Sequence, residues 1–156
     1  MDRNFGLSAL KMQMLSSAQE LRDCNEFTVR YGLVLSEDQI QSLVERRFGA
    51  LRDTGRVEFG EGILKKLILA FCDSPYLTRE NYEDTIVELQ DSFYYFKNES
   101  EDRISDDELI EFMKNVFNGR AQGSLDYLSG TSLEDLCRNT RYGYETDDTD
   151  RYGRPF

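Results

Sequence analysis

The chain has 156 residues, of which 39% are hydrophobic and 12% aromatic, enough for one domain with a real core. It contains no histidine, which excludes catalysis by a histidine base and metal ligation by imidazole. Its net charge of −11 argues against nucleic acid or an anionic membrane as a partner, and favours a basic protein or a cation.

The three cysteines, Cys24, Cys72 and Cys137, are far apart and form no CxxC pair. We expect buried free thiols in a reducing cytosol. The start of the chain, "MDRNFGLSALKMQML", lacks a basic region followed by an apolar one, and no apolar run is long enough for a membrane span. The sequence therefore predicts a cytoplasmic protein.

Apolar residues at helical spacing predict a first helix that ends near Cys24. Its expected buried face is formed by Leu7, Leu10, Met14, Leu15, Ala18 and Leu21. The following stretch, "NEFTVRYGLVL", is rich in β-branched and aromatic residues, so we expect an extended connection that could include a short strand.

Ser36 and Gln39 form a capping-box pattern before a second helix, and Gly55 follows its end. Charged residues on its other face are predicted to be solvated, namely Glu45, Arg46, Arg47 and Arg52. Residues 62–72 are apolar in almost every direction, which predicts a central buried helix. Gly60 and Gly62 precede it, but Glu61 lies between them and no phosphate-loop signature is complete, so a tight turn is expected.

Thr78 is the predicted N-cap of an aromatic-rich helix whose core stripe is Tyr82, Ile86, Leu89, Phe93 and Phe96. The candidate interaction residues on this helix are Tyr82, Phe93, Tyr94 and Tyr95. An aromatic cluster at this spacing is more typical of a core or a helix interface than of a cofactor site.

Ser105 and Glu108 predict another capped helix that ends at Gly119, and a last helical region is broken at Gly130. The sequence thus predicts a single compact all-α domain of about six helices over residues 1–141. A polar C-terminal tail is expected at 142–156.

Residues 97–108 partly match an EF-hand calcium loop. Glu99, Glu101, Ser105 and Glu108 would be the calcium ligands, with Ile104 at the buried position. Two positions argue against calcium: Lys97 stands where the first carboxylate is needed, and Asp102 stands where glycine supplies a positive φ. An acidic turn before a capped helix explains the same residues without a metal.

Carboxylate catalysis would need two acids across a cleft, one of them with a raised pKa. Glu58, Glu61 and Asp73 are the acids we consider first, although each also fits a turn or a cap. No catalytic residue and no cofactor is predicted.

Most of the negative charge lies in residues 73–111, which hold thirteen acidic and three basic residues. We therefore expect a non-enzymatic protein-interaction or accessory module that binds an unknown protein or itself through an acidic surface. The alternatives are a domain that binds a small molecule or a divalent cation and, less favoured, a carboxylate-dependent enzyme.

Two blocks carry a resemblance, "GRVEFGEGILKKLILAFCDSPYLTRENYEDTIVELQDSFYYFKNES" and "RISDDELIEFMKNVFNG", followed by "GSLDYLSGTSLEDLCR". From about residue 35 to residue 141 the chain resembles an uncharacterised bacterial family of proteins with a domain of unknown function. The resemblance implies a small, mostly helical cytoplasmic protein. It implies no activity and no functional residues.

Overall fold

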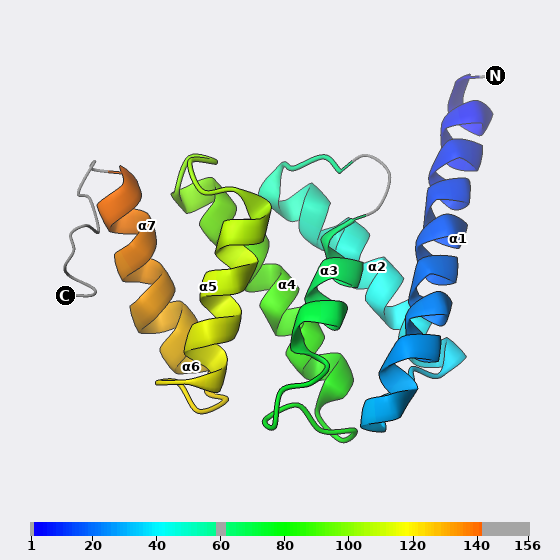
Figure 1. The fold of residues 1–156 in the computed structure, drawn as a ribbon. Coiled ribbons are helices and arrows are strands. Elements are labelled where there is room, and N and C mark those ends of the chain that lie inside the picture. The colour runs from blue at the N-terminus through cyan, green and yellow to red at the C-terminus, as the bar shows by residue number, and fades with distance from the viewer. Residues whose placement is uncertain (1, 59–61, 142–156) are drawn as a thin grey trace. The chain divides into compact units, whose positions relative to one another are not determined.

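The computed structural model describes residues 2–58 and 62–141, and in residues 2–8 and at residue 141 only the backbone. Within these ranges every regular element is helical, so the predicted all-α fold is confirmed (Figure 1). The elements in chain order are α1 (Asp2–Thr28), the 3-10 turn η1 (Val29–Tyr31), α2 (Glu37–Thr54), α3 (Ile63–Phe71), α4 (Tyr82–Glu99), α5 (Asp106–Asn118), α6 (Leu125–Tyr127), the π-helical turn η2 (Leu128–Ser132) and α7 (Leu133–Arg141).

Contacts gather in two compact units, residues 1–91 and 92–156, and the boundary between them falls within α4. In the first unit, α1 packs against both α2 and α3. In the second, η2 packs against α5 and joins α6 to α7. The predicted tail at 142–156 and the turn residues Gly60 and Glu61 lie outside the described residues.

The first helix is longer than its sequence suggests. It passes Cys24, runs to Thr28 and continues as η1 to Tyr31, so the predicted extended connection or strand was wrong for residues 25–31. Residues 33–36 form a connection without regular structure. Gly32, at φ +78°, supplies the left-handed residue that ends this helical run. The Leu33 amide donates to the Thr28 carbonyl, and the Thr28 hydroxyl donates to the Leu33 carbonyl. These two hydrogen bonds satisfy backbone groups at the end of the helix that would otherwise lack a partner.

Local capping signals in the sequence are confirmed at α2 and α5. At α2 the Ser36 side chain accepts from the Gln39 amide, the Gln39 side chain accepts from the Ser36 amide, and Gly55 ends the helix with φ +70°. At α5 the same two-way pairing joins Ser105 to Glu108. Each pairing closes within three residues and depends little on the rest of the fold.

Helix α3 buries five of the apolar side chains of residues 62–72, namely Ile63, Leu64, Leu67, Ile68 and Phe71, whereas Leu69 is 40% exposed. All three cysteines are free and buried, as expected. In the second unit the Cys137 thiol of α7 lies 3.4 Å from the Phe96 carbonyl of α4. The break predicted at Gly130 is the π-helical turn η2, which keeps the helical path while shifting its register.

The start of α4 was placed too early. Thr78 pairs with Asn81 in both directions, amide to side chain, and regular helix begins only at Tyr82. Thr78 therefore stabilises the turn that precedes the helix. The predicted core stripe from Tyr82 to Phe96 is buried throughout.

Candidate functional site

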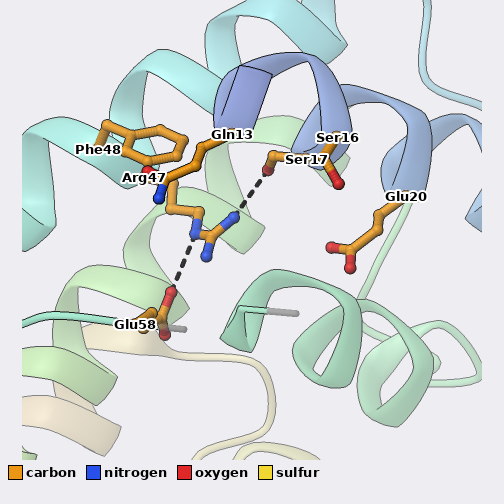
Figure 2. A pocket seen from close by; sticks show the side chains of 7 residues that line it. All are labelled: Gln13, Ser16, Ser17, Glu20, Arg47, Phe48 and Glu58. Carbon is orange, nitrogen blue, oxygen red and sulfur yellow. Dashed lines mark hydrogen bonds and ion pairs between the residues drawn. The ribbon is translucent and has the colours of Figure 1, made fainter. Parts of the chain in front are cut away.

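One face of α1 presents polar side chains toward a pocket in the first unit. Residues 13, 16, 17 and 20 follow the three-and-four spacing of a single helix face. From this face the side chains of Gln13, Ser16, Ser17 and Glu20 line the pocket, together with Arg47 and Phe48 of α2 and with Glu58 (Figure 2). The pocket has a volume of about 230 Å³.

Arg47 is the central group of this pocket. Only 4% of the residue is exposed, so the prediction of a solvated arginine on the charged face of α2 was wrong. Its Nε lies 2.9 Å from Glu58 Oε1, and its Nη1 donates to Ser17 Oγ at 3.0 Å. A buried guanidinium needs both a countercharge and hydrogen-bond acceptors, and these two neighbours supply part of that need (Figure 2).

Glu58 connects the arginine to the start of α3. While Oε1 accepts from Arg47, Oε2 accepts from the Ile63 amide at 3.2 Å. Gly62, the N-cap residue of α3, has no side chain to cap the helix, and the Glu58 carboxylate takes that role at the positive end of the helix. Of the three acids considered for catalysis, Glu58 is thus bound in an ion pair and a cap, Asp73 is exposed, and Glu61 is outside the described residues.

Gly62 is required for a reason other than a tight turn. Its φ of −89° is open to any residue. A side chain there would, however, collide with the guanidinium of Arg47. The second glycine of the predicted turn therefore provides space for the buried arginine.

The loop that resembles an EF-hand is organised by Lys97. This residue is only 6% exposed, and its ammonium lies 2.7 Å from the Ile104 carbonyl, 2.8 Å from Asp106 Oδ1 and 3.9 Å from Asp102 Oδ1. Glu101 and Asp102 both have positive φ, at +58° and +57°, so the objection that Asp102 would avoid this conformation was wrong. The positive charge of Lys97 lies among oxygens of the kind that would bind a calcium ion.

The four candidate calcium ligands do not converge. Glu108 and Ser105 are engaged in the α5 capping box, and Glu101 forms an ion pair with Arg103 at 3.2 Å. Glu99 is half-buried at the end of α4. Across residues 2–58 and 62–141, no group of three or more metal-ligating side chains is close enough to hold an ion.

The four aromatic residues predicted as interaction candidates differ in solvent exposure. Tyr82, Phe93 and Tyr94 are core residues, whereas Tyr95 is 50% exposed. Tyr95 packs edge-to-face on Phe96, with ring centroids 4.9 Å apart. Neither an aromatic patch nor an aromatic pocket unites the four residues, and only Tyr95 is available at the surface.

An exposed apolar surface occurs instead on the first half of α1. Leu10, Met12 and Leu15 are 43%, 70% and 60% exposed, although Leu10 and Leu15 were expected to face the core. The second half of the same stripe is buried at Ala18 and Leu21. Figure 1 shows that the first half of α1 extends beyond α2 and α3, the helices that cover its second half.

Sequence reasoning missed the pocket because its residues lie in three separate segments. A signal was present in part, since the polar residues at 13, 16, 17 and 20 recur at helical spacing beside the apolar stripe of α1. Helical spacing from Leu43, Val44 and Leu51 also places Arg47, and not the exposed Arg46, on the buried face of α2.

Comparison with known proteins adds a family but no activity. Residues 20–146 match the model of a family described as "Family of unknown function (DUF6323)". No curated protein and no solved structure matches the chain. In the described residues no helix is both long and apolar enough to cross a membrane.

Proposed function

The chain belongs to DUF6323, a family of unknown function, and from its exposed surfaces we propose that it is a non-enzymatic interaction module that pairs with a second copy of itself through the first half of α1. The observation that carries this proposal is the apolar stripe of α1, which is buried at Ala18 and Leu21 and exposed at Leu10 and Leu15. An exposed apolar helix face is a typical surface for another helix.

Charge favours a second copy as the occupant. Residues 3–19 form the longest stretch of the chain without an acidic residue, although the whole chain has a net charge of −11. Two copies that meet along this stretch avoid the carboxylate repulsion that most other surfaces would produce. Lys11 lies within it and keeps the segment slightly basic.

The oligomeric state in solution tests this proposal. Light scattering coupled to size-exclusion chromatography is expected to give twice the chain mass of 18.2 kDa for the parent protein and a single chain mass for Leu10→Glu/Leu15→Glu. Val29→Glu is the matched control, because Val29 is 55% exposed but lies outside the stripe, and it should leave the pairing intact.

Two outcomes would overturn self-pairing. One is a monomeric parent protein at every concentration. The other is a dimer that survives the double substitution while circular dichroism shows intact helices. A different protein that binds α1 in place of the second copy would also count against it.

A second candidate surface lies on α5, in the acidic segment 73–111. A shallow groove of about 510 Å³ is lined by Asp107, Glu108, Glu111, Phe112 and Asn115. Its charge supports binding of a basic protein segment, with an apolar residue of that segment over Phe112. Eleven of the thirteen acidic residues in segment 73–111 are exposed, which supports the same preference.

A lysine-rich peptide that contains leucine is a direct probe of this acidic groove. Binding should weaken as salt is added, and Glu111→Lys should weaken it further while Glu45→Lys on α2 should not. Equal binding by both variants would exclude the groove on α5.

A further inference from the structure

We infer that residues 151–156 of the chain, "RYGRPF", bind in the acidic groove on α5 of the same molecule and compete there with a basic partner. This docking rests on the groove on α5 proposed above as a second candidate surface, and it names a segment that fits it. It does not depend on self-pairing through α1. Residues 151–156 lie outside the described residues, so the support comes from their sequence, from the groove and from the position of the end of α7.

The charge of residues 151–156 is opposite to the charge of the groove. This segment contains Arg151 and Arg154 and no acidic residue, whereas residues 142–150 contain four acidic residues and no basic one. The groove has three carboxylates and no cation among its described lining residues, which are Asp107, Glu108, Glu111, Phe112 and Asn115. Electrostatic attraction therefore favours residues 151–156 over the rest of the sequence after residue 141.

Glu111 is the carboxylate of the groove that is best placed to pair with an arginine. It is exposed, and among the described residues it has no hydrogen-bond or ion-pair partner. Glu108, by contrast, is engaged in the capping box with Ser105. An exposed ion pair contributes little free energy by itself, so the docking also needs an apolar contact.

Phe112 provides that apolar contact. Its side chain is half-buried and lines the groove, and it directly follows Glu111 in the sequence. In the docking segment Tyr152 directly follows Arg151. The guanidinium of the segment can therefore pair with Glu111 while the neighbouring ring packs on Phe112, a combination of residue types that is typical of binding anchors.

The end of α7 lies close enough to the groove for this docking. Arg103 Nη1 donates to the Thr140 carbonyl at 3.2 Å, and Arg103 precedes Asp107, the first residue of the groove, by four residues. These residues all belong to the second unit. Four residues span at most about 15 Å, and the helix from Asp107 to Asn115 is about 12 Å long. Residues 142–150 reach about 30 Å when extended, so they can carry the segment to the groove.

The covalent link makes even a weak contact effective. A segment joined to its site through a short stretch of chain is present there at an effective concentration on the order of millimolar. A basic partner has to displace this segment, so its apparent affinity is lowered by the fraction of molecules in which the groove is open. Docking of residues 151–156 would thus regulate access to the groove.

Nitrogen–proton NMR spectra of the full chain test the docking directly. Arg151→Gln/Arg154→Gln removes the charge of the segment, and we expect it to shift the backbone amide signals of residues 107–115 relative to the parent protein. Arg46→Gln/Arg52→Gln is the matched control, because it removes two exposed arginines from α2 and should leave these signals unchanged. The difference between parent and segment variant should decrease as salt is added.

Competition with the lysine-rich peptide that contains leucine provides a second measurement. If the segment occupies the groove in about 80% of molecules, the apparent affinity of the parent protein is about fivefold lower than that of an open groove. Arg151→Gln/Arg154→Gln should therefore bind the peptide about fivefold more tightly than the parent does. Arg46→Gln/Arg52→Gln should bind it like the parent.

The two measurements separate failure of the docking from failure of the groove. Unchanged signals of residues 107–115 in Arg151→Gln/Arg154→Gln would overturn the docking, whether or not the peptide binds. Equal peptide affinity in parent and variant, with peptide-induced shifts at residues 107–115, would also overturn it while supporting the groove. Differences that disappear on dilution would assign the groove to a segment of a second copy, which contradicts docking within one molecule.

Discussion

The guanidinium of Arg47 occupies the space that a side chain at residue 62 would need, because a Cβ on Gly62 would lie 2.5 Å from Arg47 Nη2. We expect Gly62→Ala to lower the free energy of unfolding by about 1–3 kcal/mol, as overpacking of a buried site does. Urea unfolding measures this change.

Gly49→Ala in α2 is the matched control for Gly62→Ala. A Cβ on Gly49 meets only the flexible Arg52 side chain at 3.6 Å, and alanine improves helix propensity. Stability should therefore be unchanged or raised by up to about 1 kcal/mol. A Gly62→Ala protein as stable as the parent would show that Arg47 does not pack against this backbone.

The buried pair of Arg47 and Glu58 should show strong energetic coupling. Arg47→Met leaves the Glu58 carboxylate without its cation, and we expect a loss of about 3 kcal/mol. Glu58→Gln in the Arg47→Met background removes that uncompensated charge and should recover part of the loss. A double-mutant cycle by chemical unfolding gives the coupling energy, and a value near zero would contradict the role of this ion pair.

Lys97 should be a major stabilising residue of the α4–α5 loop. Lys97→Met keeps the length of the side chain but removes the ammonium bonded to Ile104 and Asp106, and a loss of about 1–3 kcal/mol is expected. A change smaller than about 0.5 kcal/mol, the usual range for a surface substitution, would show that the Lys97 interactions contribute little.

Calcium should neither bind nor stabilise the parent protein. The ammonium of Lys97 holds the loop oxygens, and Ser105 and Glu108 are committed to the helix cap. We therefore expect no heat of titration and no rise in melting temperature at millimolar calcium. A saturable heat signal would restore the loop as a calcium site.

Stability should fall at alkaline pH because of Cys24. Burial raises the pKa of its thiol to about 11, above that of an exposed cysteine. The folded state therefore favours the protonated thiol, so its stabilising contribution is complete below about pH 9 and is lost as the pH rises toward 11. Chemical unfolding over this range should give a smaller decline for Cys24→Ala than for the parent, and identical slopes would contradict the prediction.

Local signals made much of the helical architecture predictable. The capping boxes of α2 and α5 and the apolar helix α3 depend on residues within one or two turns of each other. Partners this close in sequence are brought together by the helix itself. The all-α class and these helix boundaries were therefore determined by the sequence alone.

The candidate site depended on distant partners. The partners of buried Arg47 are distant in sequence, because Ser17 lies thirty residues before it and Glu58 eleven residues after it. Only the packing of the helices brings these two side chains to the guanidinium. Tyr94 and Tyr95 are adjacent and chemically identical, yet one is buried and the other exposed.

The apolar stripe of α1 is one continuous pattern in the sequence, yet it is buried at Ala18 and Leu21 and exposed at Leu10 and Leu15. Helix periodicity determines which residues share a face. Only the ends of the neighbouring helices decide how far that face is covered, because burial depends on contacts between segments distant in the chain.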